Sequence, residues 1–302
     1  MRPPDAQTTN ISRRWKSSGI LLDEQPNLTG LLSPTPIDSP TFELCDQLTR
    51  NGYIFFRGLL DRETVHLARM AVVQQWRDVH GELPPSMTEV DAKLRREIAL
   101  NNSAIRDLSQ VDALRKLFER LLGGEIRRHD FIGLRIAPKA VCTRAHCDRV
   151  YYTRGTELLL TAWIPLGDVP VVNGGLTVLE GSNNHEGLRQ KYCTKDVDTY
   201  CINRPDADLY RTNRRRWTGE LSRDLNRLSA SLGGRWLSND YRAGDVLVFS
   251  AFTVHASLDN QLEDHRFSCD VRFQLKSDPV DHRYVGKSPL GNSLQSKRGI
   301  VC

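Results

Sequence analysis

Two histidines and one aspartate offer the residue types that bind a divalent transition metal. His146 and Asp148 are separated by a single residue, Cys147, and His255 follows much later in the chain. Alternate residues of a strand point to the same side, so the H-x-D pair can direct both side chains at one ion while Cys147 points away. Iron(II) in oxygenases takes two imidazoles and one carboxylate on one face, which leaves the opposite face open for cosubstrate and oxygen. The three residues therefore form the candidate metal site.

An H-x-D pair by itself is a weak signal. With eight histidines and 37 acidic residues, chance gives about one H-x-D/E in a chain of this length. One such decoy, His80-Gly81-Glu82, follows a helical pattern and precedes a Pro-Pro loop. Of the rival ligands, His185 lies in a turn-rich loop, and His265 directly precedes Arg266 on a predicted strand, where the two side chains face opposite sides. The alternatives for the site are a surface His–Asp pair without metal and, for His255, a hydrogen-bonded core histidine.

The strings around the candidate site are more specific than the site itself. Residues 161–168 read TAWIPLGD, residues 173–182 read NGGLTVLEGS, residues 244–249 read GDVLVF, and His255-Ala256-Ser257 precedes Asn260 and Arg266-Phe267-Ser268. On these strings the chain resembles the phytanoyl-CoA dioxygenase family of iron(II)/2-oxoglutarate oxygenases, from about residue 51 to about residue 274. The family usually has P-G-S-H at the end of the second string, whereas residues 180–185 read EGSNNH. That difference leaves the geometry of this loop open, but it does not affect the assignment of the metal triad.

The resemblance implies a fold and a set of ligands. The fold is α+β: a double-stranded β-helix core (jelly-roll, cupin-like) with flanking N-terminal helices. His146, Asp148 and His255 would bind iron(II), and Arg266 would bind the distal carboxylate of 2-oxoglutarate. A guanidinium suits that role because it is a planar, bidentate and permanently charged partner for a carboxylate.

Two further residues match family positions at the cosubstrate. Ser257 would add a hydroxyl to the same carboxylate, and Trp163 would line the cosubstrate pocket. Each assignment has a structural alternative: Ser257 could cap a turn, and Trp163 could be a core residue. Arg266 in turn could be an edge-strand arginine paired with Asp264 or Asp270.

The resemblance also implies an activity. Iron(II), 2-oxoglutarate and oxygen would hydroxylate an unactivated C–H bond of a small molecule and release succinate and carbon dioxide. In related halogenases a small residue replaces the carboxylate ligand, so Asp148 favours hydroxylation, desaturation or ring formation. The substrate could be a lipid-like acid, an acyl-CoA or a natural-product intermediate. The alternatives are a non-catalytic cupin-like binding protein, which the complete triad with Arg266 disfavours, and a nucleic-acid or protein demethylase, which would need a basic groove.

The elements that must position these residues change in character along the chain. Residues 1–40 are polar and proline-bearing and predict an N-terminal arm, and residues 41–302 predict a single domain. Its helical part, about 61–124, has apolar residues at helical spacing in 61–79 and 104–122. Its β-helix core, about 128–275, has short runs bounded by turn residues. The predicted strands are 53–60, 131–137, 157–164, 176–179, 236–241, 246–249 and 266–275.

An arginine-rich stretch interrupts the strands as an insertion at about 200–232, with a helix expected from about Thr218 to Leu232. Its arginines, including Arg223 and Arg227, could receive a carboxylate or a CoA phosphate. Acidic residues such as Glu220 and Asp224 are interleaved, so a self-neutralised, solvated helix is the favoured interpretation. Tyr151 and Tyr152, just past Asp148, could line the active site or pack in the core.

Composition limits the class of protein and its partners. The 302 residues are 39% hydrophobic and 26% charged, without an apolar run long enough to predict a membrane span. The net charge of +5 is modest and predicts no nucleic-acid partner. Seven scattered cysteines, with no C-x-x-C, favour a reducing compartment. We expect a cytoplasmic location, with a transit peptide left open, and a small-molecule substrate as the main partner; a homo-oligomer is possible but nothing indicates one.

Overall fold

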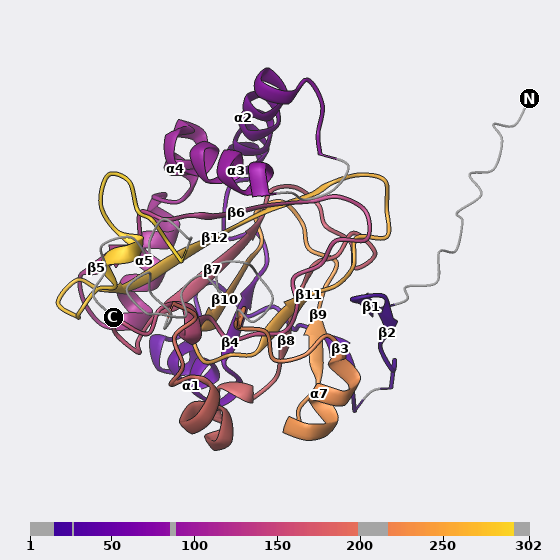
Figure 1. The fold of residues 1–302 in the computed structure, drawn as a ribbon. Coiled ribbons are helices and arrows are strands. Elements are labelled where there is room, and N and C mark those ends of the chain that lie inside the picture. The colour runs from indigo at the N-terminus through magenta and orange to yellow at the C-terminus, as the bar shows by residue number, and fades with distance from the viewer. Residues whose placement is uncertain (1–14, 26, 85–88, 199–216, 293–302) are drawn as a thin grey trace, which may run out of the picture.

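The fold consists of two facing β-sheets, one of which carries helices on its outer side (Figure 1). The computed structural model describes residues 15–25, 27–84, 89–198 and 217–292. The larger sheet has the order β4-β10-β7-β12-β5, with β6 also paired to β12, and the smaller sheet has the order β11-β8-β9-β3. This is the jelly-roll, α+β architecture expected from the sequence.

The strand bounds follow the predicted runs in most cases. The larger sheet contains β4 (Tyr53–Phe56), β5 (Ile126–Arg128), β6 (Gly133–Ala137), β7 (Leu160–Pro165), β10 (Val246–Ser250) and β12 (Arg266–Leu275). The smaller sheet contains β3 (Thr29–Leu31), β8 (Leu176–Leu179), β9 (Trp236–Ser238) and β11 (His255–Ser257). The described helices are α1 (Thr41–Asn51), α2 (Arg62–His80), α3 (Glu89–Asn101), α4 (Ser103–Leu108), α5 (Asp112–Leu122) and α7 (Leu225–Leu232).

Alternation along β12 separates an apolar face from a polar one. Phe267 and Phe273 lie in the hydrophobic core that the larger sheet shares with the helices, where Phe273 stacks on Phe118 of α5 at a centroid distance of 4.0 Å. Arg266 and Arg272 therefore face the opposite side, the space between the two sheets. Both arginines are buried there. The sheet thus presents charged side chains to the interior of the β-helix.

Several helices differ from the sequence prediction. The pattern expected as one helix over 104–122 forms α4 and α5, separated where the Ser109 hydroxyl donates to the carbonyl of Arg106 at 2.6 Å. Helices α1 and α3 were not predicted. The helix expected from Thr218 begins only at Leu225, because the Asp224 carboxylate accepts from the amide of Arg227 at 3.0 Å and caps the first turn there.

Part of the expected N-terminal arm contributes to the β-structure. Strand β1 (Lys16–Ser17) pairs with β2 (Ile20–Leu21), and β3 adds a parallel edge to the smaller sheet through β9. Trp15 is buried, and the Ser17 hydroxyl donates to the carbonyl of Ser257 at 3.0 Å. These residues therefore pack on the core, although the domain boundary at residue 40 stays a prediction.

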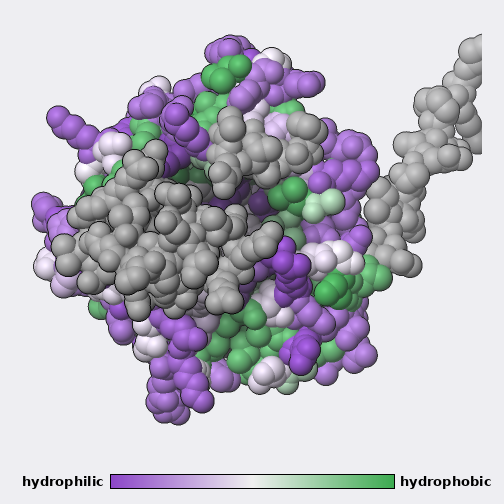
Figure 2. Space-filling view, viewed as in Figure 1, coloured by the Kyte–Doolittle hydropathy of each residue, from purple (hydrophilic) through white to green (hydrophobic). Residues whose placement is uncertain are grey.

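The arginine-rich stretch falls mostly outside the described residues, since residues 199–216 are among those not described. Arg223 and Arg227 are exposed. On the face seen in Figure 2, the described surface mixes hydrophilic and hydrophobic patches, with hydrophilic side chains along much of its margin. Within the described ranges, none of the helices combines the length and the apolar character needed to cross a membrane.

Candidate metal centre

Main-chain hydrogen bonds bring the two candidate histidines together. His146 donates its amide to the carbonyl of His255 at 3.0 Å, and His255 returns the same bond at 2.9 Å. The expected strand at the H-x-D pair is wrong: only Ala145 and His146 form isolated bridges, and Asp148 opens a 3₁₀ turn that runs to Tyr151. The 3₁₀ turn replaces strand geometry after Cys147, yet it still directs Asp148 to the same side as His146.

The three candidate ligands converge in the buried interior. One ligand atom from each residue lies within 4.8 Å of the others. The Asp148 Oδ1 atom is 3.8 Å from His146 Nε2 and 3.7 Å from His255 Nε2. The exposed fractions are 6% for His146, 1% for Asp148 and 4% for His255. Cys147 points away, with its thiol donating to the carbonyl of Phe252 at 3.3 Å.

Hydrogen bonds fix the tautomer of both imidazoles. The Nδ1 atom of His146 lies 2.7 Å from the carbonyl of Arg144, and that of His255 lies 3.0 Å from the carbonyl of Thr253. A carbonyl only accepts, so each Nδ1 carries the proton and each Nε2 keeps a lone pair toward Asp148. A hydrogen bond from the other ring nitrogen to a carbonyl is the usual support of a metal-binding histidine. The donor set of two imidazole nitrogens and one carboxylate oxygen fits an iron(II) ion.

The protonation states also suit metal binding. Burial, followed by the charge of His255, lowers the pKa of His146 to about 3, and burial lowers the pKa of His255 in the same direction. Burial alone would raise the pKa of Asp148, but Arg272, the two histidines and Thr161 outweigh it and hold that pKa well below its usual range. At neutral pH the site therefore presents two neutral imidazoles and one carboxylate, which are the states that bind metal.

Two residues that the sequence analysis did not single out hold Asp148. Arg272 donates from Nε to Asp148 Oδ2 at 3.1 Å and forms an ion pair with it through Nη2 at 3.0 Å, and the Thr161 hydroxyl donates to the same oxygen at 2.7 Å. Arg272 has the same parity as Arg266 on the predicted strand 266–275. That parity was the available signal that a second arginine would face the interior.

Arg266 lies on the inner face of β12 without a carboxylate partner. It is 3% exposed, and its Nη1 donates to the carbonyl of Gly174 at 2.6 Å, while its Nε has no hydrogen-bond partner among the residues that the structure describes. The alternative pairings with Asp264 or Asp270 are not found among the ion pairs of the described residues. Burial lowers the pKa of Arg266 to about 10. A buried guanidinium with a free donor is suited to receive the carboxylate of a ligand.

The Asn-Gly-Gly string places the carbonyl that Arg266 contacts. Gly174 has φ +80°, and a Cβ on it would lie 2.6 Å from the carbonyl oxygen of Leu258, so only glycine fits. The Asn173 side-chain amide donates to the Asn260 side-chain oxygen at 2.9 Å and ties this turn to the segment after β11.

Ser257 and Trp163 are both buried in the interior. The Ser257 hydroxyl accepts from the amide of Thr143 at 2.7 Å, which leaves its own proton available to a further acceptor. Trp163 packs on Tyr241 at a centroid distance of 4.7 Å and shares the inward parity of Thr161 on β7. Their roles at the cosubstrate stay predictions.

The remaining histidine candidates are engaged elsewhere. His185 Nδ1 accepts from the amide of Leu188 at 3.2 Å, and His265 Nε2 lies 2.7 Å from the carbonyl of Pro84. The decoy His80 is exposed at the end of α2. In the described part of the chain, the group formed by the triad is the one cluster of His, Cys, Asp and Glu side chains close enough to hold a metal ion.

The sequence left two further features open, the tyrosines after Asp148 and the Asn183-Asn184 pair. Tyr151 borders the site, with its ring at 5.5 Å and nearly perpendicular to that of His146, whereas Tyr152 packs beneath the Arg272 guanidinium at 4.8 Å. The unusual Asn183-Asn184 pair donates from both side-chain amides to the carbonyl of Thr49, at 2.9 and 2.8 Å. These bonds tie the loop to α1.

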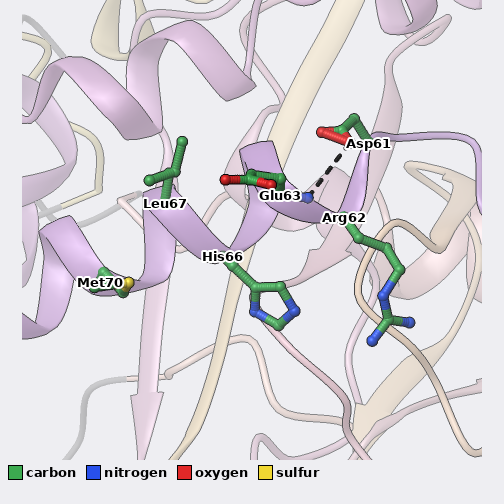
Figure 3. Close-up of a pocket in the computed structure, with 6 residues that line it drawn as sticks. All are labelled: Asp61, Arg62, Glu63, His66, Leu67 and Met70. Carbon is green, nitrogen blue, oxygen red and sulfur yellow. Dashed lines mark hydrogen bonds between the residues drawn. The ribbon is translucent and has the colours of Figure 1, made fainter.

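A surface hollow of about 500 Å³ lies at the start of α2, away from the triad. Figure 3 shows the six residues that line it, with the Asp61 carboxylate turned toward the first turn of the helix that it caps. None of its lining residues belongs to the candidate site. The residues are Asp61, Arg62, Glu63, His66, Leu67 and Met70.

A double-stranded β-helix with two neutral imidazoles and a carboxylate in its interior defines the class of non-haem metal oxygenases. The sequence profile described as "Phytanoyl-CoA dioxygenase (PhyH)" matches residues 48–268. The chain belongs to this family, and it is therefore an enzyme: an iron- and 2-oxoglutarate-dependent dioxygenase.

The individual relatives named below share less than 30% of their residues with the chain. The chain is 27% identical to a 1-deoxypentalenic acid 11-beta-hydroxylase of Streptomyces arenae over 243 residues, 75% of this chain and 78% of that protein. EctD from S. alaskensis, solved with 2-oxoglutarate and 5-hydroxyectoine, superposes with a TM-score of 0.58 at 17% identity over 90% of this chain and 92% of that one. The epimerase SnoN, solved with Fe3+, alpha ketoglutarate and nogalamycin RO, superposes with a TM-score of 0.54 at 21% identity over 82% and 86%. These structures share the fold.

Proposed function

We propose that this enzyme hydroxylates an unactivated C–H bond of a small carboxylic acid, with His146, Asp148 and His255 binding iron(II) and Arg266 binding 2-oxoglutarate. The observation that carries the proposal is the pairing of a preorganised triad with a buried arginine whose Nε has no partner. Both features lie on the inner side of the β-helix.

The residues have distinct roles in this proposal. The two Nε2 atoms and Asp148 Oδ1 would hold iron on one face, and the Arg266 guanidinium would orient 2-oxoglutarate by its distal carboxylate. Ser257 would donate its free proton to that carboxylate, and Trp163 would exclude water from the cosubstrate. When bound, iron and 2-oxoglutarate supply the oxidising chemistry, in which oxygen is consumed and succinate, carbon dioxide and hydroxylated product are released.

The substrate class is inferred from one half-exposed arginine and from the relatives. Leu134 and Ile136 of β6 belong to the core with the helices, so Arg135 between them faces the interior. Its side chain is 40% exposed, and its Nε donates to Asp270 at 3.3 Å, which leaves the terminal nitrogens without a described partner. The relatives are named for a carboxylic acid substrate. A free guanidinium edge facing the site would suit a substrate carboxylate.

The first experiment tests the metal and the cosubstrate. Anaerobic addition of iron(II) and 2-oxoglutarate should produce a weak visible charge-transfer band, which His146→Ala should abolish, and admission of oxygen should then release succinate. A wild-type protein without the band, or a band that survives in His146→Ala, contradicts the proposed site.

The second experiment tests the substrate class. Hydrophobic carboxylic acids, 1-deoxypentalenic acid among them, should stimulate succinate release more than their methyl esters. Arg135→Gln should remove this preference while keeping the band. Equal stimulation by acids and esters in the wild type would refute the acid assignment.

We place the reaction in the cytoplasm.

A further inference from the structure

The two carboxylate oxygens of Asp148 lie in different environments. Oδ1 faces the two imidazole nitrogens, at 3.8 and 3.7 Å. Oδ2 accepts two hydrogen bonds, from the Thr161 hydroxyl at 2.7 Å and from Arg272 Nε at 3.1 Å, and Arg272 Nη2 lies 3.0 Å away as an ion-pair contact. Two hydrogen bonds engage both lone pairs of this oxygen, and the nearby guanidinium charge further disfavours a metal ion there.

We propose that Arg272 is a positioning residue that restricts Asp148 to binding the metal through one oxygen, Oδ1. The inference rests on the proposed iron site. A carboxylate can bind a metal through one oxygen or two. Two imidazoles and one carboxylate oxygen would leave room on a six-coordinate ion for cosubstrate and oxygen. A second oxygen from Asp148 would take one of the remaining positions and compete with cosubstrate or oxygen.

The donors to Oδ2 are held rigidly. Arg272 and Thr161 are direct partners in the β12–β7 ladder, so their side chains leave the sheet side by side and on the same face. The Arg272 guanidinium lies over the Tyr152 ring at 4.8 Å and is 3.9 Å from Asp270. Its side chain is buried. The geometry at Oδ2 is therefore set before any metal arrives.

The close packing behind Arg272 depends on the absence of a side chain at position 133. A Cβ on Gly133 would lie 2.8 Å from Asp270 Oδ2 and 3.4 Å from an Arg272 terminal nitrogen. A lysine at position 272 would keep the charge but not the fixed fork, because an ammonium is a point charge on a flexible stem. The charge and the shape of the Arg272 side chain thus contribute separately to holding Asp148.

The test compares Arg272→Met, Arg272→Lys and Thr161→Val with the wild type, using cobalt(II) in place of iron. The visible absorption of bound cobalt reports its coordination, independently of turnover. We expect Arg272→Met to raise the cobalt Kd about 10- to 100-fold, as loss of a group that hydrogen-bonds a metal ligand generally does, and to change the absorption spectrum. Arg272→Lys should recover part of the affinity but not the wild-type spectrum. Thr161→Val removes one donor and should shift both readouts in the same direction.

The control is Arg57→Met, which removes an ion pair to the buried carboxylate of Asp245 at 2.6 Å, on residues outside the site. It should lower the melting temperature and leave cobalt binding unchanged. If Arg272→Met behaves like this control, with wild-type Kd and spectrum, Arg272 is merely structural and the inference fails. If Arg272→Met does not fold, unchanged cobalt binding in Thr161→Val overturns it. A wild-type protein that binds no metal refutes the proposed function instead.

Discussion

Arg266 allows the cosubstrate assignment to be tested against stability. Burial lowers its pKa from an ordinary 12.5 to about 10, since the guanidinium is 3% exposed and makes no ion pair to a carboxylate of the described residues. At about 1.4 kcal/mol per pKa unit, the charged form costs the folded chain about 3 kcal/mol. Binding of a carboxylate would offset this cost.

Arg266→Met removes the charge and keeps most of the side-chain length. In the unliganded protein, loss of the hydrogen bond to Gly174 should lower the stability by about 1–2 kcal/mol. Removal of the buried charge should relieve the cost of about 3 kcal/mol given above. Its free energy of unfolding should therefore stay unchanged or rise by about 1–2 kcal/mol. In contrast, 2-oxoglutarate should bind about 3 kcal/mol more weakly, or about 150-fold in Kd.

Two measurements decide the outcome. Urea denaturation without 2-oxoglutarate gives the stability, and titration of the anaerobic charge-transfer band gives the Kd of 2-oxoglutarate. Arg57→Met should show the opposite pattern, with lower stability and unchanged Kd, because Arg57 pairs with Asp245. If Arg266→Met is as destabilised as this control and binds 2-oxoglutarate within about threefold of wild type, the arginine is structural and the assignment is wrong.

The buried histidines, the Asp148 carboxylate and the turn at Gly174 each give a further prediction. Burial lowers the pKa of His146 to about 3 and of His129 to about 4. Between these values and about pH 6.5, the unfolded chain of the metal-free protein binds more protons than the folded one, so the free energy of unfolding should fall as the pH drops below about 6.5. His129→Gln should reduce the slope of the free energy of unfolding against pH by up to about 1.4 kcal/mol per pH unit, measured by urea denaturation. Asp148→Asn keeps the side-chain shape but removes the charge, and should abolish the charge-transfer band on addition of iron(II) and 2-oxoglutarate. Gly174→Ala should destabilise the fold by about 2 kcal/mol or more, because it adds a main-chain clash at 2.6 Å to a positive φ; Gly123→Ala, with a similar φ and open space, should cost only about 1–2 kcal/mol.

Two strands were predicted correctly at both ends, and one of them carries Arg266. The runs at 176–179 and 266–275 match β8 and β12 at both ends, and both strands are buried on both faces along almost their whole length, as near-continuous apolar or alternating runs predict. The convergence of His146, Asp148 and His255 was also predicted. That success came from the spacing of the surrounding strings and not from the H-x-D pair, which a decoy at His80 matches.

Other features depend on contacts that no local pattern records. Asp148 leaves the strand geometry because a 3₁₀ turn follows Cys147, and Arg272 becomes a partner of Asp148 only when β12 pairs with β7. The N-terminal strands exist because distant segments accept them, as the Ser17 hydroxyl bond to Ser257 illustrates. Tertiary contacts override weak local propensity in each case.

The reciprocal main-chain bonds between His146 and His255 have a consequence for the maturation of the enzyme. They join residues that are distant in the chain, so the two imidazoles meet only after a long loop has closed. Pairings of this kind form slowly, and the site cannot exist on a chain whose C-terminal third is still unsynthesised. Metal uptake should therefore be a late event, and the rate at which refolding protein gains metal affinity would time the closure of the β-helix.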